Sequence, residues 1–292
     1  MKPLVTIGMP IKNGFLNKKE GEINIKNALM SVLKQSYKNL EIIISNNCSD
    51  DKTGSFLEKI SKKDNRIKYF DQKFEIPGTG NFQFVLDQAS GKYFKWNCHD
   101  DIISSDFIEK NIEFLENNLD YSCSSSKFCF EGEKNNLFSR SLNKNLYLRI
   151  KNFFDIRFSS HNIFYSVGKK EFFIESSHMK YPYLANDWVT SLNLLSNGSF
   201  KTIKSGFLIV GNGSSRSKDF FKSKWFNTSI TNSIFPLYDF TKDFFKLILN
   251  LKKLSYIEKL SLALICIKIN LTFSLRKLKY DFYSRNIRNF FK

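Results

Sequence analysis

Continuous apolar runs alternate along the first 120 residues with segments whose apolar residues recur every three or four positions. The runs predict buried strands over residues 4–11, 40–45, 67–70 and 92–98, and the spaced segments predict helices over 24–36, 53–62, 81–89 and 105–118. Strands that alternate with helices are typical of βαβ units, in which the strands are parallel and the crossovers right-handed. The pattern therefore predicts an α/β fold with a mostly parallel sheet flanked by helices.

The second half of the chain is less regular. Residues 121–185 show no sustained period, whereas a helix is predicted over 186–197 and a strand over 207–210. From about residue 240, Leu and Ile recur at helical spacing between charged residues. Residues 242–292 contain 12 Lys and Arg but 3 Asp and Glu. This C-terminal part predicts a basic amphipathic helical appendage.

The composition narrows the class of protein. Hydrophobic residues make up 42% of the 292 residues, which excludes global disorder, and 45 Lys and Arg against 28 Asp and Glu give a net charge of +17. Such a surplus favours nucleic acid, anionic lipid or phosphorylated substrates as partners. Five cysteines without a CxxC pair argue against a disulfide framework or zinc ribbon and favour a reducing compartment. No apolar stretch approaches the roughly 20 residues of a membrane span.

Polar side chains follow three of the predicted strands. Asn13 comes after the first strand, residues 46–51 after the second, and Asp100 after the fourth. The carboxyl ends of parallel strands form one edge of a sheet, and ligands bind along that edge. A carboxylate there can hold Mg²⁺ or Mn²⁺ and, through the ion, a diphosphate. The alternatives remain that Asp101 or Ser104 caps the next helix and that the turn at 46–51 is polar for local reasons.

Two further segments carry candidate chemistry. Asp187 opens the helix predicted at 186–197, where a carboxylate is either a helix cap or a general base that deprotonates a hydroxyl group. His161 lies in a polar break before an apolar run, which makes it a candidate site residue. The segment GTGN at residues 78–81 could face a phosphate, although its spacing matches no phosphate-binding motif and equally fits a plain turn.

The order of these segments is more informative than any one of them. Pro10 and Asn13 precede SVLKQSYKNLEIIISNNCSDDKT at residues 31–53, and ASGKYFKWNCHDD follows at residues 89–101. This arrangement resembles family 2 glycosyltransferases with the GT-A (Rossmann-like) fold, densely over about residues 3–120 and more weakly over 161–216. The resemblance implies a catalytic domain over residues 1–216, followed by a basic helical region over residues 217–292.

The resemblance also implies an activity and its residues. It implies an inverting enzyme that moves a sugar from a nucleotide-sugar, by default a UDP-sugar, to a hydroxyl of a saccharide or lipid-linked saccharide in bacterial cell-surface glycan or lipopolysaccharide synthesis. Asp187 would be the catalytic base and Asp100 the ligand of Mg²⁺ or Mn²⁺. The residues implied to bind the nucleotide-sugar are Pro10, Asn13, Asn46, Asn47, Ser49, Asp51, Asn81, His99, Asp100 and Arg216. His161 and Trp188 would lie on the acceptor side.

Three residues depart from the family pattern. Cys98 stands at the first acidic position of the DxD-like motif, Asn46 replaces the usual Asp of the turn, and Asn186 replaces the Glu before the base. A catalytically impaired glycosyltransferase-like binding module therefore remains an alternative. A nucleotidyltransferase is another, because it would use a similar sheet and acidic site. Nucleic acid is not an expected partner, since no RRM, KH or zinc-finger pattern occurs.

The resemblance suggests a role for the basic C-terminal region. Bacterial enzymes of this type often act on lipid-linked saccharides, and basic amphipathic helices bind anionic membrane surfaces. Residues 242–292 therefore predict a cytoplasmic protein bound peripherally at the inner face of the plasma membrane. The alternative is that these helices pack on the first domain or on a second copy of the chain.

Overall fold

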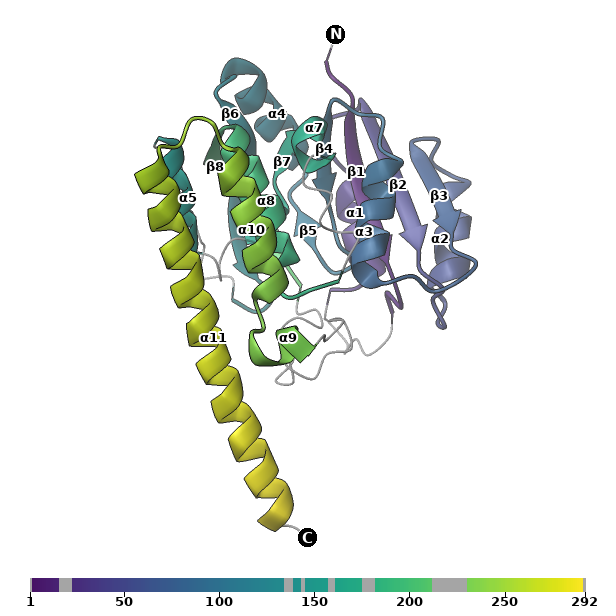
Figure 1. Ribbon diagram of the computed structural model, residues 1–292. Coiled ribbons are helices and arrows are strands. Elements are labelled where there is room, and N and C mark those ends of the chain that lie inside the picture. The colour runs from purple at the N-terminus through teal and green to yellow at the C-terminus, as the bar shows by residue number, and fades with distance from the viewer. Residues whose placement is uncertain are drawn as a thin grey trace.

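The computed structural model describes residues 2–15, 23–133, 139–142, 145–156, 161–174, 182–211 and 230–290, with side chains as far as residue 279 except at 230 and 233. The described residues form a mixed sheet of eight strands with helices on its faces (Figure 1). The strand order is β3-β2-β1-β4-β7-β6-β8-β5. This architecture confirms the predicted α/β class with a sheet flanked by helices.

The first half of the sheet is parallel, as predicted. It contains β1 (Val5–Ile11), β2 (Leu40–Asn46), β3 (Ile67–Asp71) and β4 (Tyr93–Trp96), with β1 paired to β2 and β4 and β2 paired to β3. Four helices alternate with these strands: α1 (Ile25–Leu33), α2 (Thr53–Ser61), α3 (Gly78–Asp87) and α4 (Phe107–Asn117). Every residue of β1, β2 and β4 is buried, which is why apolar residues predominate in these strands. The segment at 78–81 forms the first turn of α3 rather than a turn before it.

The second half of the sheet is mixed. It contains β5 (Ile102–Ile103), β6 (Tyr121–Phe130), β7 (Val167–Lys169) and β8 (Ser199–Val210), and β7 runs antiparallel between β4 and β6. β6 and β8 are parallel, while β5 is antiparallel to β8. The helices here are α5 (Leu146–Ile156), α6 (His161–Phe164), α7 (Lys170–Ile174) and α8 (Asn186–Asn197). The sequence pattern predicted α8 correctly, but it missed β6 and the first eight residues of β8.

The C-terminal region is helical, as predicted, and part of it packs on the sheet domain. It contains α9 (Ile230–Ile234), α10 (Tyr238–Asn250) and α11 (Tyr256–Phe290). α10 contacts α8 and α11 contacts α5. The ring of Trp188 in α8 lies 5.6 Å from Phe240 of α10 and 6.3 Å from Phe273 of α11 between ring centroids. One hydrophobic core therefore includes residues from both the sheet domain and the C-terminal helices.

The far end of α11 leaves this core. Figure 1 shows α11 running alongside the domain and then extending beyond the sheet toward the C-terminus. In the part of the chain that the structure describes, no helix combines the length and the apolar character needed to cross a bilayer. The five cysteines are all free thiols.

Candidate functional site

The carboxyl ends of β1, β2, β3 and β4 lie along one edge of the sheet because these strands are parallel. The backbone N–H of Asn97, directly after β4, donates to the carbonyl of Gly8 in β1 at 2.9 Å. The polar segments that follow these strands are therefore neighbours, as predicted from the sequence. This edge is where open α/β sheets bind ligands.

The turns after β1 and β2 are bonded to each other. Asn13 adopts a left-handed backbone conformation (φ 50°), which Asn tolerates better than most residues. Its side-chain oxygen accepts from the Asp50 N–H at 2.8 Å, and its own N–H donates to the Ser49 hydroxyl at 2.9 Å. The Asp51 carboxylate accepts from the N–H groups of Phe15, at 3.0 Å, and Thr53, at 2.9 Å. Asn13, Ser49 and Asp51 thus meet beside Pro10, which lies in β1.

The amides of Asn46, Asn47 and Asn81 brace the same edge. Asn46 donates to the Asp71 carboxylate at 2.8 Å and accepts from the Ser49 hydroxyl at 2.5 Å. Asn47 bonds both backbone groups of Ile76, at 2.8 Å and 2.9 Å. Asn81 donates to the carbonyl of Ser45 at 3.2 Å, while its buried Oδ1 has no hydrogen-bond partner among the described residues. These amides hold the edge together, and their contact with a nucleotide stays a prediction.

The turn after β4 places two carboxylates side by side in a buried setting. Asp101 is 1% exposed, and its carboxylate accepts from the Cys98 N–H at 3.2 Å and from the Gly211 N–H at 3.1 Å. Burial raises the pKa of Asp101, and the charge of Asp100 raises it further. Burial lowers the pKa of Lys95, whose ammonium donates to the carbonyl of Trp96 at 2.7 Å. The opposite charges of Lys95 and Asp101 act against both shifts.

Gly211 brings the end of β8 against Asp100. A Cβ atom at Gly211 would lie 2.5 Å from both Cγ and the carbonyl oxygen of Asp100, so this position has room for glycine alone. Asp100 itself is 5% exposed, and His99 beside it is partly buried. The chain therefore leaves β8 at the acidic turn. Arg216, predicted to bind the nucleotide-sugar, lies outside the described residues.

The residues at this turn supply a divalent cation with part of its ligand shell. Asp100 offers hard oxygen ligands of the kind that Mg²⁺ and Mn²⁺ prefer. Cys98 does not replace the missing acid, because burial raises the pKa of its thiol and its sulfur lies 3.2 Å from the Tyr165 hydroxyl. Among the described residues, no cluster of three or more His, Cys, Asp or Glu could hold a metal. The donor set fits an ion whose shell is completed by substrate phosphates, not a closed protein site.

Asp187 lies in the first turn of α8. Its carboxylate accepts from the backbone N–H groups of Asp187 and Trp188, but burial outweighs these bonds and raises the pKa of Asp187 to about 6. Ala185, the residue before α8, has a left-handed backbone (φ 68°) that turns the chain into the helix. A carboxylate with this pKa is ionised at pH 7 yet accepts a proton readily, as a general base must.

A chain of contacts connects α8 with the acidic turn. α6 contacts α8, and Tyr165, directly after α6, reaches Cys98. His161 begins α6, with its ring 5.3 Å from that of Phe130. The Trp188 ring is 7% exposed and packs in the core, so its predicted contact with an acceptor is not visible in the structure and stays a prediction.

Sequence reasoning missed three residues at this edge. Lys95 lies in an otherwise apolar strand, and its charge was the available signal. Asp71 ends β3, and its carboxylate accepts from the amide of Asn46 at the end of β2. The family pattern has an Asp at the position of Asn46, so here the carboxylate lies on the neighbouring strand instead. Tyr165 gave no signal, because an aromatic residue in an apolar run is indistinguishable from an ordinary core residue.

Comparisons with known proteins agree with this geometry. The family model for glycosyl transferase family 2 matches residues 6–181. An uncharacterized glycosyltransferase of Haemophilus influenzae is 42% identical over 94 residues, which cover 32% of this chain and 29% of that protein. The GalNAc(5)-diNAcBac-PP-undecaprenol beta-1,3-glucosyltransferase of Campylobacter jejuni is 29% identical over 181 residues, covering 61% and 58%. The chain thus matches well under two thirds of the length of these relatives.

Solved structures share the fold at low sequence identity. S. aureus TarS 1-349 in complex with UDP-GlcNAc has a TM-score of 0.64 and 17% identity, over 93% of this chain and 73% of that one. The mannosyltransferase PcManGT of Pyrobaculum calidifontis, in complex with GDP-Man and Mn²⁺, has a TM-score of 0.58 and 13% identity, over 98% and 76%. These similarities confirm the GT-A fold.

Proposed function

Because the chain belongs to glycosyltransferase family 2, we propose that it moves a sugar from a nucleotide-sugar to a hydroxyl of a saccharide acceptor and inverts the anomeric centre. The observation that carries the proposal is that two buried or partly buried carboxylates, Asp100 and Asp187, lie in different parts of the domain. Asp100 lies at the sheet edge beside the turns after β1 and β2, whereas Asp187 is set apart at the start of α8 with a pKa near 6. One suits the donor diphosphate and the other suits the acceptor hydroxyl.

Each residue then has a defined task. The turns that contain Asn13, Ser49 and Asp51 form the surface for the base and ribose. Asp100 holds a Mg²⁺ or Mn²⁺ ion, which offsets charge on the departing diphosphate when it is bound. Asp187 accepts the acceptor's proton as that oxygen attacks the sugar from the face opposite the leaving group. A single displacement of this kind inverts the configuration and requires no covalent enzyme intermediate.

Donor and acceptor follow from the relatives as proposals. A UDP-sugar is the default donor, supported by the UDP-GlcNAc complex of TarS; the GDP-Man complex of PcManGT makes GDP-sugars the next to test. The Campylobacter jejuni relative is named for an undecaprenol-linked acceptor, which supports a lipid-linked saccharide in cell-surface glycan synthesis. Residues 242–292, with 12 basic and 3 acidic residues, would bind the anionic inner face of the plasma membrane peripherally.

Nucleotide binding and turnover test this proposal. The purified chain is screened by thermal shift against UDP-, GDP- and dTDP-sugars with Mn²⁺, and release of nucleoside diphosphate is followed. One nucleotide class should stabilise the chain. Asp100→Ala should remove that stabilisation, and Asp187→Asn should retain it but abolish turnover. Asp120→Asn, a change at an exposed acid away from the edge, is the matched control.

The outcomes separate the alternatives. Stabilisation without turnover, even with lipid-linked acceptors, would support a binding module. Release of pyrophosphate from a nucleoside triphosphate would identify a nucleotidyltransferase. A folded chain that no nucleotide stabilises would overturn the proposed donor site.

A further inference from the structure

α11 carries a stripe of large apolar side chains that stay exposed in the part of the chain that the structure describes. Eight large apolar side chains on this helix are between 41% and 80% exposed: Tyr256, Ile257, Leu260, Leu264, Ile267, Leu271, Leu275 and Leu278. At 3.6 residues per turn they fall within an arc about 100° wide and extend for about 30 Å along the helix. Scattered exposed apolar residues are ordinary, but a continuous stripe of this length marks an interaction surface.

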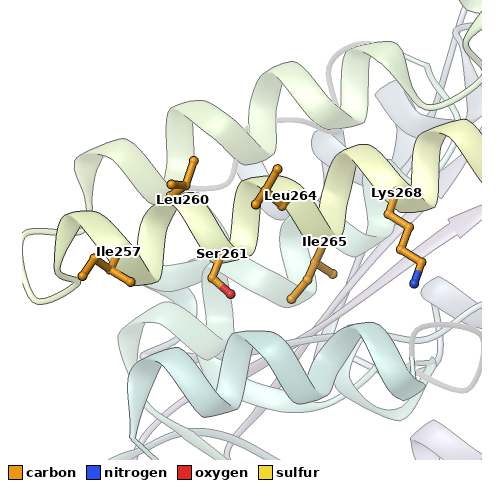
Figure 2. A pocket seen from close by; sticks show the side chains of 6 residues that line it. All are labelled: Ile257, Leu260, Ser261, Leu264, Ile265 and Lys268. Atoms are coloured by element: carbon orange, nitrogen blue, oxygen red, sulfur yellow. The ribbon is translucent and has the colours of Figure 1, made fainter.

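The stripe is distinct from the face with which α11 packs on the domain. That inner face consists of Leu262, Cys266, Ile269 and Phe273, each at most 8% exposed. A hollow of about 400 Å³ lies against the stripe, lined by Ile257, Leu260 and Leu264 of the stripe and by Ser261, Ile265 and Lys268 beside it (Figure 2). Figure 2 shows Ser261, Ile265 and Lys268 pointing to one side of α11, and the Ser261 hydroxyl lies 2.9 Å from that of Tyr147 in α5. α11 therefore has two apolar faces, and the domain occupies one of them.

The charges beside the stripe identify the kind of partner. Residues 259–279 contain five basic residues and no acidic one. On the helix, Lys268 and Lys279 lie along one edge of the stripe, and both are exposed. Lys259 and Lys277 lie nearer the other edge. A second copy of this chain would bring like charges together across the stripe, whereas anionic lipid headgroups would complement them.

We propose that this outward face of α11 docks on an anionic lipid bilayer, with the helix lying along the surface. The leucines and isoleucines of the stripe enter the boundary between headgroups and acyl chains, while the lysines contact lipid phosphates. This rests on the membrane association proposed above and assigns it to one face of α11, because the inner face, Leu262, Cys266, Ile269 and Phe273, is used in packing. In Figure 1 α11 runs along the outside of the domain, so docking brings this flank of the molecule to the membrane.

Vesicle binding by the full chain tests the assignment. Binding to sedimenting vesicles of phosphatidylcholine alone is compared with binding to vesicles of phosphatidylcholine and phosphatidylglycerol in equal parts. The wild type should bind the anionic vesicles and lose affinity as salt is raised. The double variant Leu264→Glu/Leu271→Glu should bind them at least tenfold more weakly. Leu119→Glu is the matched control, since Leu119 is 74% exposed and lies away from α11.

The result can overturn the proposal in three ways. One is a wild type that does not bind anionic vesicles, and another is a double variant that binds them as tightly as Leu119→Glu does. The third is a wild-type dimer, seen by light scattering, that the double substitution dissociates. The last result would assign the stripe to a second copy. Circular dichroism and nucleotide thermal shift on the same samples keep the two proposals apart. A folded variant that still responds to nucleotide but not to vesicles supports docking independently of the donor site.

Discussion

Gly211→Ala tests whether the end of β8 holds the acidic turn in place. In the structure the N–H of Gly211 donates to the Asp101 carboxylate at 3.1 Å. An added methyl group would lie 2.5 Å from Cγ and from the carbonyl oxygen of Asp100, and 2.6 Å from its Cβ. All three distances are about 1 Å shorter than ordinary contact. Because two of these atoms belong to the backbone or the stem of Asp100, either the turn or the end of β8 must move.

The cost of this movement follows from its two parts. Overpacking a tight site costs about 1–3 kcal/mol, and loss of a hydrogen bond to a buried carboxylate costs about 1.5–3 kcal/mol. Together they lower the free energy of unfolding by about 2.5–6 kcal/mol. At about 2–4 °C per kcal/mol for a chain of this size, we expect the Tm to fall by about 5–24 °C. Displacement of Asp100 should also weaken metal-dependent nucleotide binding by at least tenfold.

Thermal unfolding with and without a nucleotide and Mn²⁺ measures both effects. Gly80→Ala is the matched control, because the nearest atoms to its added methyl group lie at 3.8 Å and 4.0 Å. This control should retain the wild-type Tm. A Gly211→Ala protein with the Tm and nucleotide response of the wild type would show that β8 does not constrain Asp100, and the reasoning would fail.

Two other predictions concern the proposed base and the C-terminal helices. Since the pKa of Asp187 is near 6, turnover should fall about tenfold for each pH unit below 6 and level off above pH 7. A flat profile of kcat/KM from pH 5 to 7 in folded protein would contradict the role of Asp187 as the base. Phe240→Ala should cost about 3–5 kcal/mol and lower the Tm by about 6–20 °C in a single transition, because Phe240 is fully buried between Phe244 and Trp188. Leu249→Ala, on the exposed side of the same helix, should change the Tm by less than about 2 °C, whereas separate unfolding of the C-terminal region would refute a shared core.

The first half of the fold was predictable because three of its four parallel strands are buried on both faces. The segment at residues 40–45 contains Leu40 and three consecutive isoleucines, and in the structure every residue of β2 is buried. Strands buried on both faces can be recognised in a sequence as runs of mostly apolar residues, without an alternating pattern. The polar turns that follow them were predictable for the same reason, since parallel strands place their carboxyl ends together. The sequence therefore sufficed to place Asn13, Asp51 and Asp100 on one edge.

β6 was missed because its buried side chains are polar. Its sequence, YSCSSSKFCF, is typical of a loop, yet Ser122 and residues 124–126 are at most 1% exposed. Small hydroxyl groups can be buried when a partner is available, and the Ser124 hydroxyl donates to the Asn111 side chain of α4 at 2.7 Å. That partner lies 13 residues away in the chain, so a local pattern could not reveal it. Lys95 was overlooked for a related reason, because the charge that balances it is evident only in three dimensions.

α11 shows why helical periodicity predicted the C-terminal helices but not their surfaces. Periodicity detects one apolar face opposite a polar one, whereas the two apolar faces of α11 lie nearly opposite each other and partly cancel in such a measure. The inner face fits α10 and α5 and is consumed by folding. The outer face cannot reach the domain without rotating the inner face into water, so the domain leaves it exposed. Folding thus uses the inner face of α11 to stabilise the domain and leaves exposed the leucine-rich face that we propose docks on a membrane.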